Sequence, residues 1–223
     1  MYPILKRILF ILIITYLSNT MAIGQDGLSL FGSAEYKSDD IQSFKKWNAQ
    51  RKRHTQEEIN KQRRSNYISL QSCRRTKNFK CISDEWLEAI NSLKDKKPME
   101  KIEGVNMHLN NISYVTDITN WRQKDYWATI SQFLNRDGDC EDYAIAKYYS
   151  LKELGFTSDQ MRIVVVEDTN LNIAHAVLAV YYDNKIWILD NQISQIIEHE
   201  KIVHYTPLYS INEKAWWLHK KIS

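Results

Sequence analysis

The chain has 223 residues, of which 30 are Lys or Arg and 27 are Asp or Glu, so its formal net charge is +3. This near balance gives no global case for nucleic-acid binding, and the length suffices for one hydrophobic core with a helical arm. Glycine and proline are scarce, at six and three residues, and no repeat or low-complexity linker divides the chain.

Residues 1–24 have the pattern of an export signal. Lys6 and Arg7 precede an apolar run over residues 8–17, and small residues around Ala22 offer a cleavage site. The run is shorter than the roughly 20 residues of a permanent membrane-spanning helix, although an uncleaved anchor is the alternative. We therefore expect removal of residues 1–24, which takes away two positive charges and no acid and lowers the net charge from +3 to +1.

Residues 25–82 are predicted to form a polar and basic, mostly helical arm. Residues 25–40 are polar and are expected to lack regular structure, whereas residues 41–80 are charged and helical in character. The basic residues there form either a solvated helical face or a docking surface for an acidic partner or an anionic membrane. Cys73 and Cys81 are close enough in sequence to form a disulfide in an oxidising compartment, which the sequence leaves open.

The remaining residues, 83–223, are predicted to form one domain in which helices precede strands. Ser83 is placed to cap one helix, and Pro98 to open the next. A further helix is expected from near Asp139 to Gly155, because glycine favours the left-handed conformation at a helix C-terminus. Strands are expected at residues 161–166, 174–182 and 185–191. This order indicates an α+β fold with helices packed on an antiparallel sheet.

The last two predicted strands relate one histidine to one aspartate. If the turn lies at residues 183–184, the numbers of paired residues sum to 367, as for Tyr182 and Lys185. Because side chains alternate along a strand, His175 and Asp190 then share a face as diagonal neighbours, roughly 7–8 Å apart between backbones. A shift of one residue in the pairing would put them on opposite faces.

Cys140 is predicted to begin a helix, where the peptide dipoles and free backbone N–H groups favour a thiolate. A thiol nucleophile needs a base, and the base needs a group that orients it, so Cys140, His175 and Asp190 form a candidate triad. The N–H of Cys140 is a candidate donor to an oxyanion. The alternative is structural, with Cys140 as a small buried residue and His175 as a core histidine. Taken together, the three residues favour a cysteine peptidase.

Three acids, Asp139, Glu141 and Asp142, flank this thiol. Carboxylates so close would raise the pKa of Cys140 and oppose its activation. Asp139 is placed to cap the helix, which accounts for part of the pattern. A hard cation such as Ca²⁺, which prefers carboxylate oxygens, would account for more of it, although the spacing is not that of an EF-hand loop. The spacing alone leaves this choice open.

Several segments resemble the bacterial transglutaminase-like cysteine peptidases of the LapG type. They read DYWAT at residues 125–129, GDCEDYAIAKY at 138–148, AHAVL at 174–178, LDN at 189–191 and PLYSIN at 207–212. The resemblance covers roughly residues 84–218 and implies a papain/transglutaminase-like fold with Cys140, His175 and Asp190 as the triad. It also implies calcium near the site, held by Asp139, Glu141 and Asp142.

The resemblance further implies a biological setting. Proteases of this type are periplasmic and release large adhesins from the outer membrane by cutting near the adhesin N-terminus, between two alanines. An inner-membrane cyclic-di-GMP receptor of the LapD type sequesters them, and the outcome is regulated biofilm dispersal. Two other functions stay open: amide transfer from glutamine to lysine through the same thioester, and a non-catalytic periplasmic adaptor. No nucleic-acid partner is expected.

Overall fold

The computed structural model describes residues 29–65 and 82–222, and it combines helices with one antiparallel sheet, as the sequence predicted. The strands are β1 (Ser33–Ser38), β2 (Met161–Asp168), β3 (Ile173–Tyr182), β4 (Lys185–Leu189), β5 (Ile197–Glu198), β6 (Tyr205–Ile211) and β7 (Trp216–Lys221). The helices are α1 (Lys45–Ser65), α2 (Ile82–Leu93), α3 (Pro98–Leu109), α4 (Asp117–Trp121), α5 (Ile130–Arg136) and α6 (Cys140–Glu153), with short 3₁₀ turns η2 (Leu30–Gly32), η4 (Ser158–Gln160) and η5 (His199–Lys201). Within the described ranges, no helix combines the length and the apolar character needed to cross a membrane.

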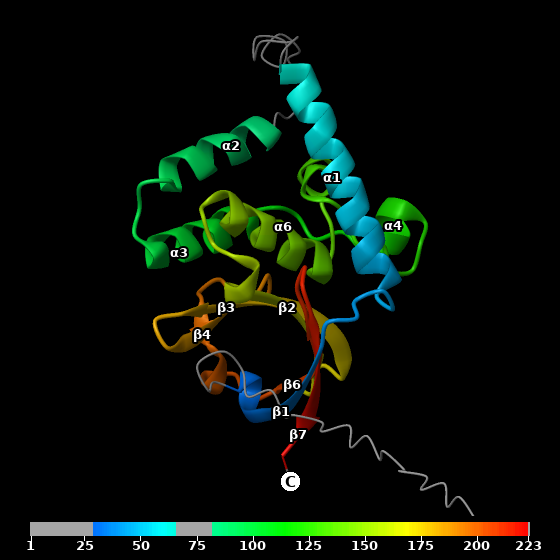
Figure 1. Ribbon diagram of the computed structural model, residues 1–223, viewed down its shortest axis with the longest axis vertical. Helices are drawn as coiled ribbons and strands as arrows, with labels where there is room; N and C mark the ends of the chain where they lie inside the picture. The colour runs from blue at the N-terminus through cyan, green and yellow to red at the C-terminus, as the bar shows by residue number, and fades with distance from the viewer. Residues whose placement is uncertain (1–28, 66–81, 223) are drawn as a thin grey trace, which may run out of the picture.

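The sheet has the order β1-β7-β6-β2-β3-β4-β5 and is strongly curved, with the helices gathered on one side of it (Figure 1). Its central strands are buried on both faces because apolar side chains alternate between two clusters. In β2, Met161 and Ile163 belong to the cluster under the helices, whereas Val164 and Val166 belong to the cluster on the other face. The fold is thus an α+β arrangement with a core on each side of the sheet.

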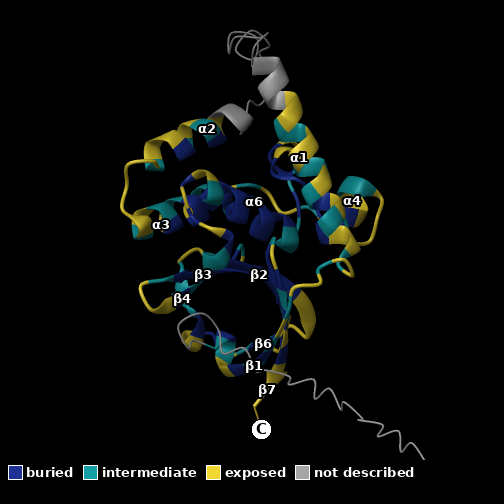
Figure 2. Ribbon diagram, viewed as in Figure 1, coloured by how far each residue is buried: buried dark blue, intermediate teal, exposed yellow. Residues whose placement is uncertain are grey.

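Helix α6 occupies the middle of the molecule and is buried at every position from Asp142 to Leu151, as its dark ribbon in Figure 2 shows. The helix ends before Gly155, whose φ of +95° is the left-handed conformation predicted for that position. The packing of α6 fixes the place of its first residue, Cys140, against the sheet.

The predicted hairpin has the expected register. Tyr182 pairs with Lys185 and Leu178 pairs with Leu189, so the paired numbers sum to 367. Asp183 and Asn184 both have a φ of +55°, the conformation that two-residue hairpin turns require. Helix α3 also begins at Pro98 as predicted. Helix α2 already includes Ile82, so Ser83 lies within its first turn and the prediction that Ser83 precedes the helix was wrong.

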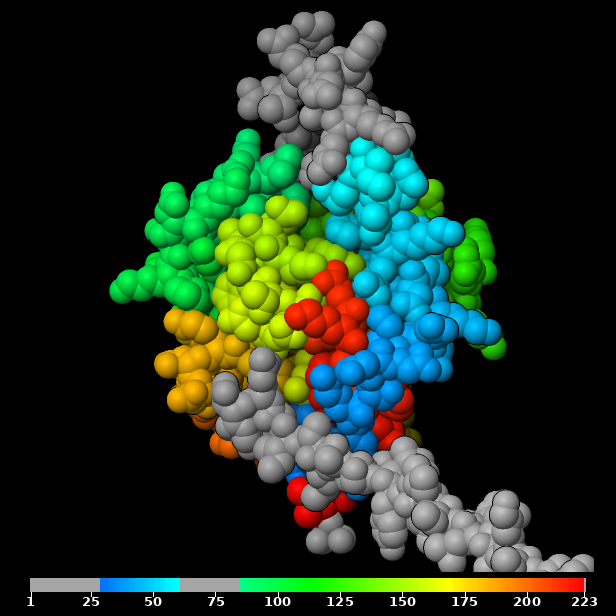
Figure 3. Space-filling view, in the orientation of Figure 1, coloured from blue at the N-terminus to red at the C-terminus, as the bar shows by residue number. Residues whose placement is uncertain are grey.

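The N-terminal region differs from the prediction. Residues 33–38, expected to lack regular structure, form β1, which pairs with β7 so that Ser33 lies opposite Lys221; Figure 3 shows this segment in blue against the C-terminal strand in red. In α1, Trp47 is fully buried and its Nε1 donates to the Asn212 carbonyl at 3.0 Å. The start of the predicted arm is therefore part of the core. Residues 1–28, Cys73 and Cys81 lie outside the described residues.

Candidate active site

Cys140 is the first residue of α6 and lies beside β3. The backbone N–H of Ala176 donates toward its sulfur, which tends to lower the pKa of the thiol. Ala176 directly follows His175, so this contact places the thiol beside the residue next to the candidate base. Cys140 is a free, half-buried cysteine. The structure thus brings together Cys140 and Ala176, which are 36 positions apart in the sequence.

The predicted histidine and aspartate meet on the shared face of β3 and the end of β4. His175 Nε2 lies 2.9 Å from Asp190 Oδ1, and both side chains are buried. This bond places the ring proton on Nε2, which leaves the Nδ1 lone pair for proton transfer. The Gln192 side-chain nitrogen lies 3.5 Å from Nδ1, a distance at the limit for a hydrogen bond. His175 therefore has the tautomer that a base needs.

Asp190 accepts three hydrogen bonds. Besides His175, the Gln192 backbone N–H donates to Oδ1 at 2.9 Å and the Tyr205 hydroxyl donates to Oδ2 at 2.6 Å. Burial would raise the pKa of Asp190, but the bonds from His175, Tyr205 and Gln192 outweigh it and hold the pKa below its ordinary value. The carboxylate is therefore ionised and fixed, as required of a group that orients a histidine.

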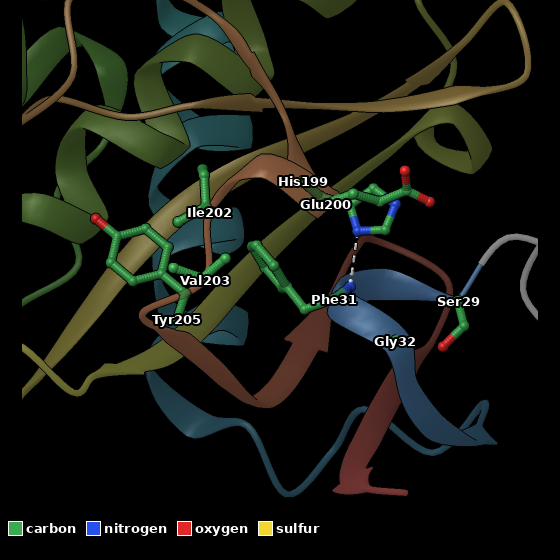
Figure 4. Close-up of a pocket in the computed structure, with 8 residues that line it drawn as sticks. All are labelled: Ser29, Phe31, Gly32, His199, Glu200, Ile202, Val203 and Tyr205. Carbon is green, nitrogen blue, oxygen red and sulfur yellow. Dashed lines mark hydrogen bonds between the residues drawn. The ribbon is translucent and has the colours of Figure 1, made fainter.

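Tyr205 was missed by sequence reasoning. It begins β6, and its ring centroid lies 5.7 Å from that of His175 and 6.2 Å from that of Phe31. Tyr205 also lines a surface pocket of about 580 Å³ together with Phe31 and His199, as Figure 4 shows. In this pocket the Phe31 N–H donates to His199 Nδ1 at 2.9 Å. No local pattern marks Tyr205 for this role, because β6 is joined to β3 and β4 only through the folded sheet.

The thiol is held in its neutral form by its surroundings. Cys140 Sγ donates to Glu141 Oε2 at 3.1 Å. Burial raises the pKa of Cys140, and the carboxylates of Glu141 and Asp139 raise it further, which the Ala176 N–H offsets only in part. The predicted opposition between acids and thiol is thus present. Activation of Cys140 requires positive charge near these acids, or displacement of the Glu141 side chain.

Three of the acids converge behind the thiol. Asp117, Asp139 and Asp142 each use one carboxylate oxygen to accept a backbone N–H, from Tyr126, Asp117 and Ala128 respectively. The second oxygen of each is buried and has no hydrogen-bond partner among the described residues. Oxygens of these three side chains lie within 4.8 Å of one another. A buried carboxylate oxygen without a donor is costly, and either a proton or a bound cation would relieve that cost.

A second set of acids, Asp117, Asp125 and Glu141, is equally close and shares Asp117 with the first. Burial, as the largest cause, raises the pKa of Asp142 to about 9, of Glu141 to about 8 and of Asp117 to about 6. Such carboxylates fit the all-oxygen ligand set that Ca²⁺ prefers. Of the predicted ligands, Asp139 and Asp142 belong to the first set and Glu141 to the second.

The sequence missed Asp117 and Asp125 as members of this cluster. Asp117 starts α4, and its N–H and carboxylate reach the site only because α4 folds back onto the loop before α6. Asp139 occupies the predicted cap position of α6, but its side chain makes no capping bond and accepts from the Asp117 N–H instead. The capping interpretation of Asp139 is therefore wrong, and its carboxylate belongs to the acidic cluster.

Gly138 permits the close approach of these groups. A Cβ atom at this position would lie 2.4 Å from Asp142 Oδ2 and 2.8 Å from Phe133 Cδ2, well inside van der Waals contact. The backbone before Cys140 can therefore pass over Asp142 only without a side chain. This explains on steric grounds why glycine stands two residues before the thiol.

A thiol at the start of a buried helix, beside a hydrogen-bonded His–Asp pair on an antiparallel sheet, is the arrangement of a thiol-nucleophile enzyme of the transglutaminase-like class. The chain belongs to the family of bacterial transglutaminase-like cysteine proteinases, whose family model matches residues 56–220. Family membership supports a peptidase function.

Solved structures of Legionella pneumophila LapG are similar to this chain. One is 36% identical over 61% of this chain and 77% of LapG, with a TM-score of 0.57. The EGTA-treated form gives 36% identity, 61% and 75% coverage and a TM-score of 0.57. The calcium-bound form gives 34% identity, 73% and 86% coverage and a TM-score of 0.59. A comparison with curated proteins gave no match.

Proposed function

We propose that this protein is a periplasmic, calcium-dependent cysteine endopeptidase that cleaves the N-terminal region of a large surface adhesin at an Ala-Ala site. In this proposal a LapD-like inner-membrane cyclic-di-GMP receptor inhibits it, and cleavage releases the adhesin and promotes biofilm dispersal. The observation that carries the peptidase reaction is the buried His175–Asp190 pair beside Cys140. The substrate and the receptor are what the resemblance to LapG-type peptidases implies, and the signal-like residues 1–24 support the periplasm.

In this proposal each member of the triad has one role. Asp190 holds the proton on His175 Nε2, so that Nδ1 accepts the thiol proton. The Cys140 sulfur then attacks the scissile carbonyl carbon, and the backbone N–H of Cys140 at the start of α6 donates to the oxyanion. His175 returns the proton to the leaving amine as the C–N bond breaks, which leaves a thioester. Water, deprotonated by His175, hydrolyses the thioester and restores the thiol.

The acidic cluster would hold calcium through Asp117, Asp139 and Asp142, and Asp125 and Glu141 form the second set together with Asp117. When bound, the ion supplies positive charge that offsets the carboxylates next to the thiol. Glu141 and Asp139 are the two acids that raise the pKa of Cys140, so the same residues connect the cluster to the nucleophile. The existence of LapG structures in calcium-bound and EGTA-treated forms supports this assignment.

The test is cleavage of an adhesin N-terminal module containing an Ala-Ala site by the purified protein, in calcium and in EGTA. We expect cleavage in calcium, loss in EGTA and recovery when calcium is returned, with Cys140→Ala inactive throughout. Addition of the periplasmic domain of a cyclic-di-GMP receptor should inhibit cleavage. Absence of cleavage in both conditions, with incorporation of an amine probe into a glutamine substrate, would replace the peptidase proposal by amide transfer.

A further inference from the structure

Asp190 stands on a loop that the sheet does not hold. Strand β4 ends at Leu189 and β5 begins at Ile197, so residues 190–196 lie outside the strand ladder. The backbone carbonyls of such a loop need donors from elsewhere, because buried peptide groups are almost always paired. The position of the Asp190 carboxylate depends on what supplies these donors.

Two asparagines at the C-terminal end of α3 supply them: Asn106 lies within the helix, and Asn110 is its C-cap residue. Asn110 Nδ2 donates to the carbonyl of Asp190 at 2.8 Å and lies 3.4 Å from that of Ile193, while Asn106 Nδ2 donates to the carbonyl of Ser194 at 3.0 Å. Asn106 and Asn110 are four residues apart and therefore lie on the same face of the helix. Together the two amides fasten both ends of the segment that begins with Asp190.

The orientation of both amides follows from their partners. A backbone carbonyl only accepts, so each asparagine must present its nitrogen to the loop. Each amide thus hydrogen-bonds the loop through its nitrogen, while its oxygen is buried without a partner among the described residues. Helix α3 itself is anchored in the core by Ile102, Val105 and Leu109, so the asparagines project from a rigid support.

We propose that Asn106 and Asn110 are positioning residues that hold residues 190–194 so that Asp190 meets His175 Nε2. The inference rests on the proposed function, since it assigns these residues to the same triad. Without the two donors the loop carbonyls would turn toward water and the Asp190 backbone would shift. A displacement of about 1 Å at a catalytic group can lower the rate by about 100-fold.

The sharpest variant is Asn110→Asp, which keeps the shape of the side chain and removes the donor. An aspartate oxygen facing the Asp190 carbonyl would repel it. We expect kcat to fall at least tenfold with KM unchanged, because Asp190 acts on His175 and not on substrate binding. Asn110→Ala, which adds no charge, should show a smaller fall in the same parameter. The matched control is Asn111→Asp at the exposed neighbouring position, which should behave as wild type.

A readout independent of peptidase activity is the NMR signal of the His175 Nε2 proton. In the wild type, the bond to Asp190 should give a sharp downfield resonance, assigned through its loss in His175→Gln. We expect this resonance to broaden or move upfield in Asn110→Asp and Asn110→Ala but not in Asn111→Asp. Circular dichroism of each variant checks that the fold is retained, and Asn110→Ala serves if Asn110→Asp does not fold.

The two readouts separate the possible outcomes. Wild-type kcat together with an unchanged His175 resonance in both Asn110 variants would overturn the positioning role. A parallel rise in KM with kcat intact would also overturn it, because it would indicate a contact with substrate. If the wild type cleaves no adhesin while the resonance still responds to Asn110, the positioning role is supported and the peptidase proposal fails on its own.

Discussion

Asp190 and Asp142 are both fully buried carboxylates, yet their surroundings have opposite effects. Asp190 accepts hydrogen bonds on both oxygens, and its pKa lies below the ordinary value. Asp142 accepts one bond, from the Ala128 N–H, and burial raises its pKa to about 9. Burial raises the pKa of both acids, but His175, Tyr205 and Gln192 outweigh it at Asp190, whereas the neighbouring carboxylates of Asp139, Glu141 and Asp117 add to it at Asp142.

The two environments correspond to two tasks. Asp190 accepts hydrogen bonds on both carboxylate oxygens, so it can orient His175 without a further ligand. Asp142 has one oxygen without a donor among the described residues and lies in the acidic cluster, so it needs a positively charged ligand to be stabilised in its ionised form. The site therefore contains a preorganised part and a part that depends on a ligand.

The largest effects are expected from replacing either acid by its amide. Asp190→Asn should lower kcat by about 10³–10⁴-fold, because the histidine loses the partner that fixes its tautomer.

Asp142→Asn should leave the protein as stable in EGTA as the wild type, or more stable, while removing the response to calcium. Cleavage rates and melting temperatures measured in calcium and in EGTA test both. Equal calcium responses in Asp142→Asn and the wild type would break the comparison.

Calcium should stabilise the wild type, and more so at high pH. At a concentration of 100 times Kd, binding contributes about 2.7 kcal/mol, a rise in Tm of roughly 5–10 °C. Burial raises the folded-state pKa of Asp142 to about 9 and of Glu141 to about 8. A raised folded pKa means that the stability from these protonated acids is fully present below pH of about 4 and is lost as pH rises through 8 to 9.

In EGTA, Tm should therefore decline from pH 5 to pH 8. Calcium should raise Tm more at pH 8 than at pH 5, because fewer protons then compete with calcium for the carboxylates. Thermal melts at both pH values with and without calcium measure this. Asp142→Asn is the control, because it removes one titrating group and should flatten the pH dependence in EGTA. A calcium-induced rise in Tm that is larger at pH 5 would contradict the assignment of these acids.

Gly138→Ala should selectively disturb the part of the site that depends on a ligand. The new Cβ would meet Asp142 Oδ2 at 2.4 Å, so the backbone or the acid must move, at a cost of about 1–3 kcal/mol. We expect a lower Tm and weaker calcium binding, measured by titration calorimetry. Gly104→Ala is a matched control, since its Cβ meets the flexible end of Leu93 at 2.5 Å. A weakened calcium response in both variants would indicate a general effect.

Sequence reasoning reached one side of this comparison better than the other. The approach of His175 to Asp190 follows from strand alternation and one hairpin turn, both local, and the structure has that register. Tyr205, Asp117 and Asp125 could not be found this way, because β6 and α4 reach the site only through tertiary packing. The same holds for β1, whose six residues become a strand by pairing with β7 at the other end of the chain.

Tyr205→Phe gives the smallest expected effect and tests the comparison most directly, because it leaves Asp190 with one unsatisfied oxygen, as in Asp142. The ring can keep its contacts with His175 and Phe31, so the lost hydrogen bond dominates, at about 1–3 kcal/mol.

Because Asp190 has a depressed folded pKa, its contribution to stability is present above the unfolded pKa and is lost as pH falls through the folded one. Without the Tyr205 donor that pKa rises, so the acid limb of the pH profile of kcat should move to higher pH and kcat should fall several-fold.

Tyr209→Phe, on the same strand, keeps every donor to Asp190 and should retain the wild-type profile. An unshifted acid limb in Tyr205→Phe would mean that His175 and Gln192 alone keep Asp190 ionised, and that the number of donors matters less than their identity.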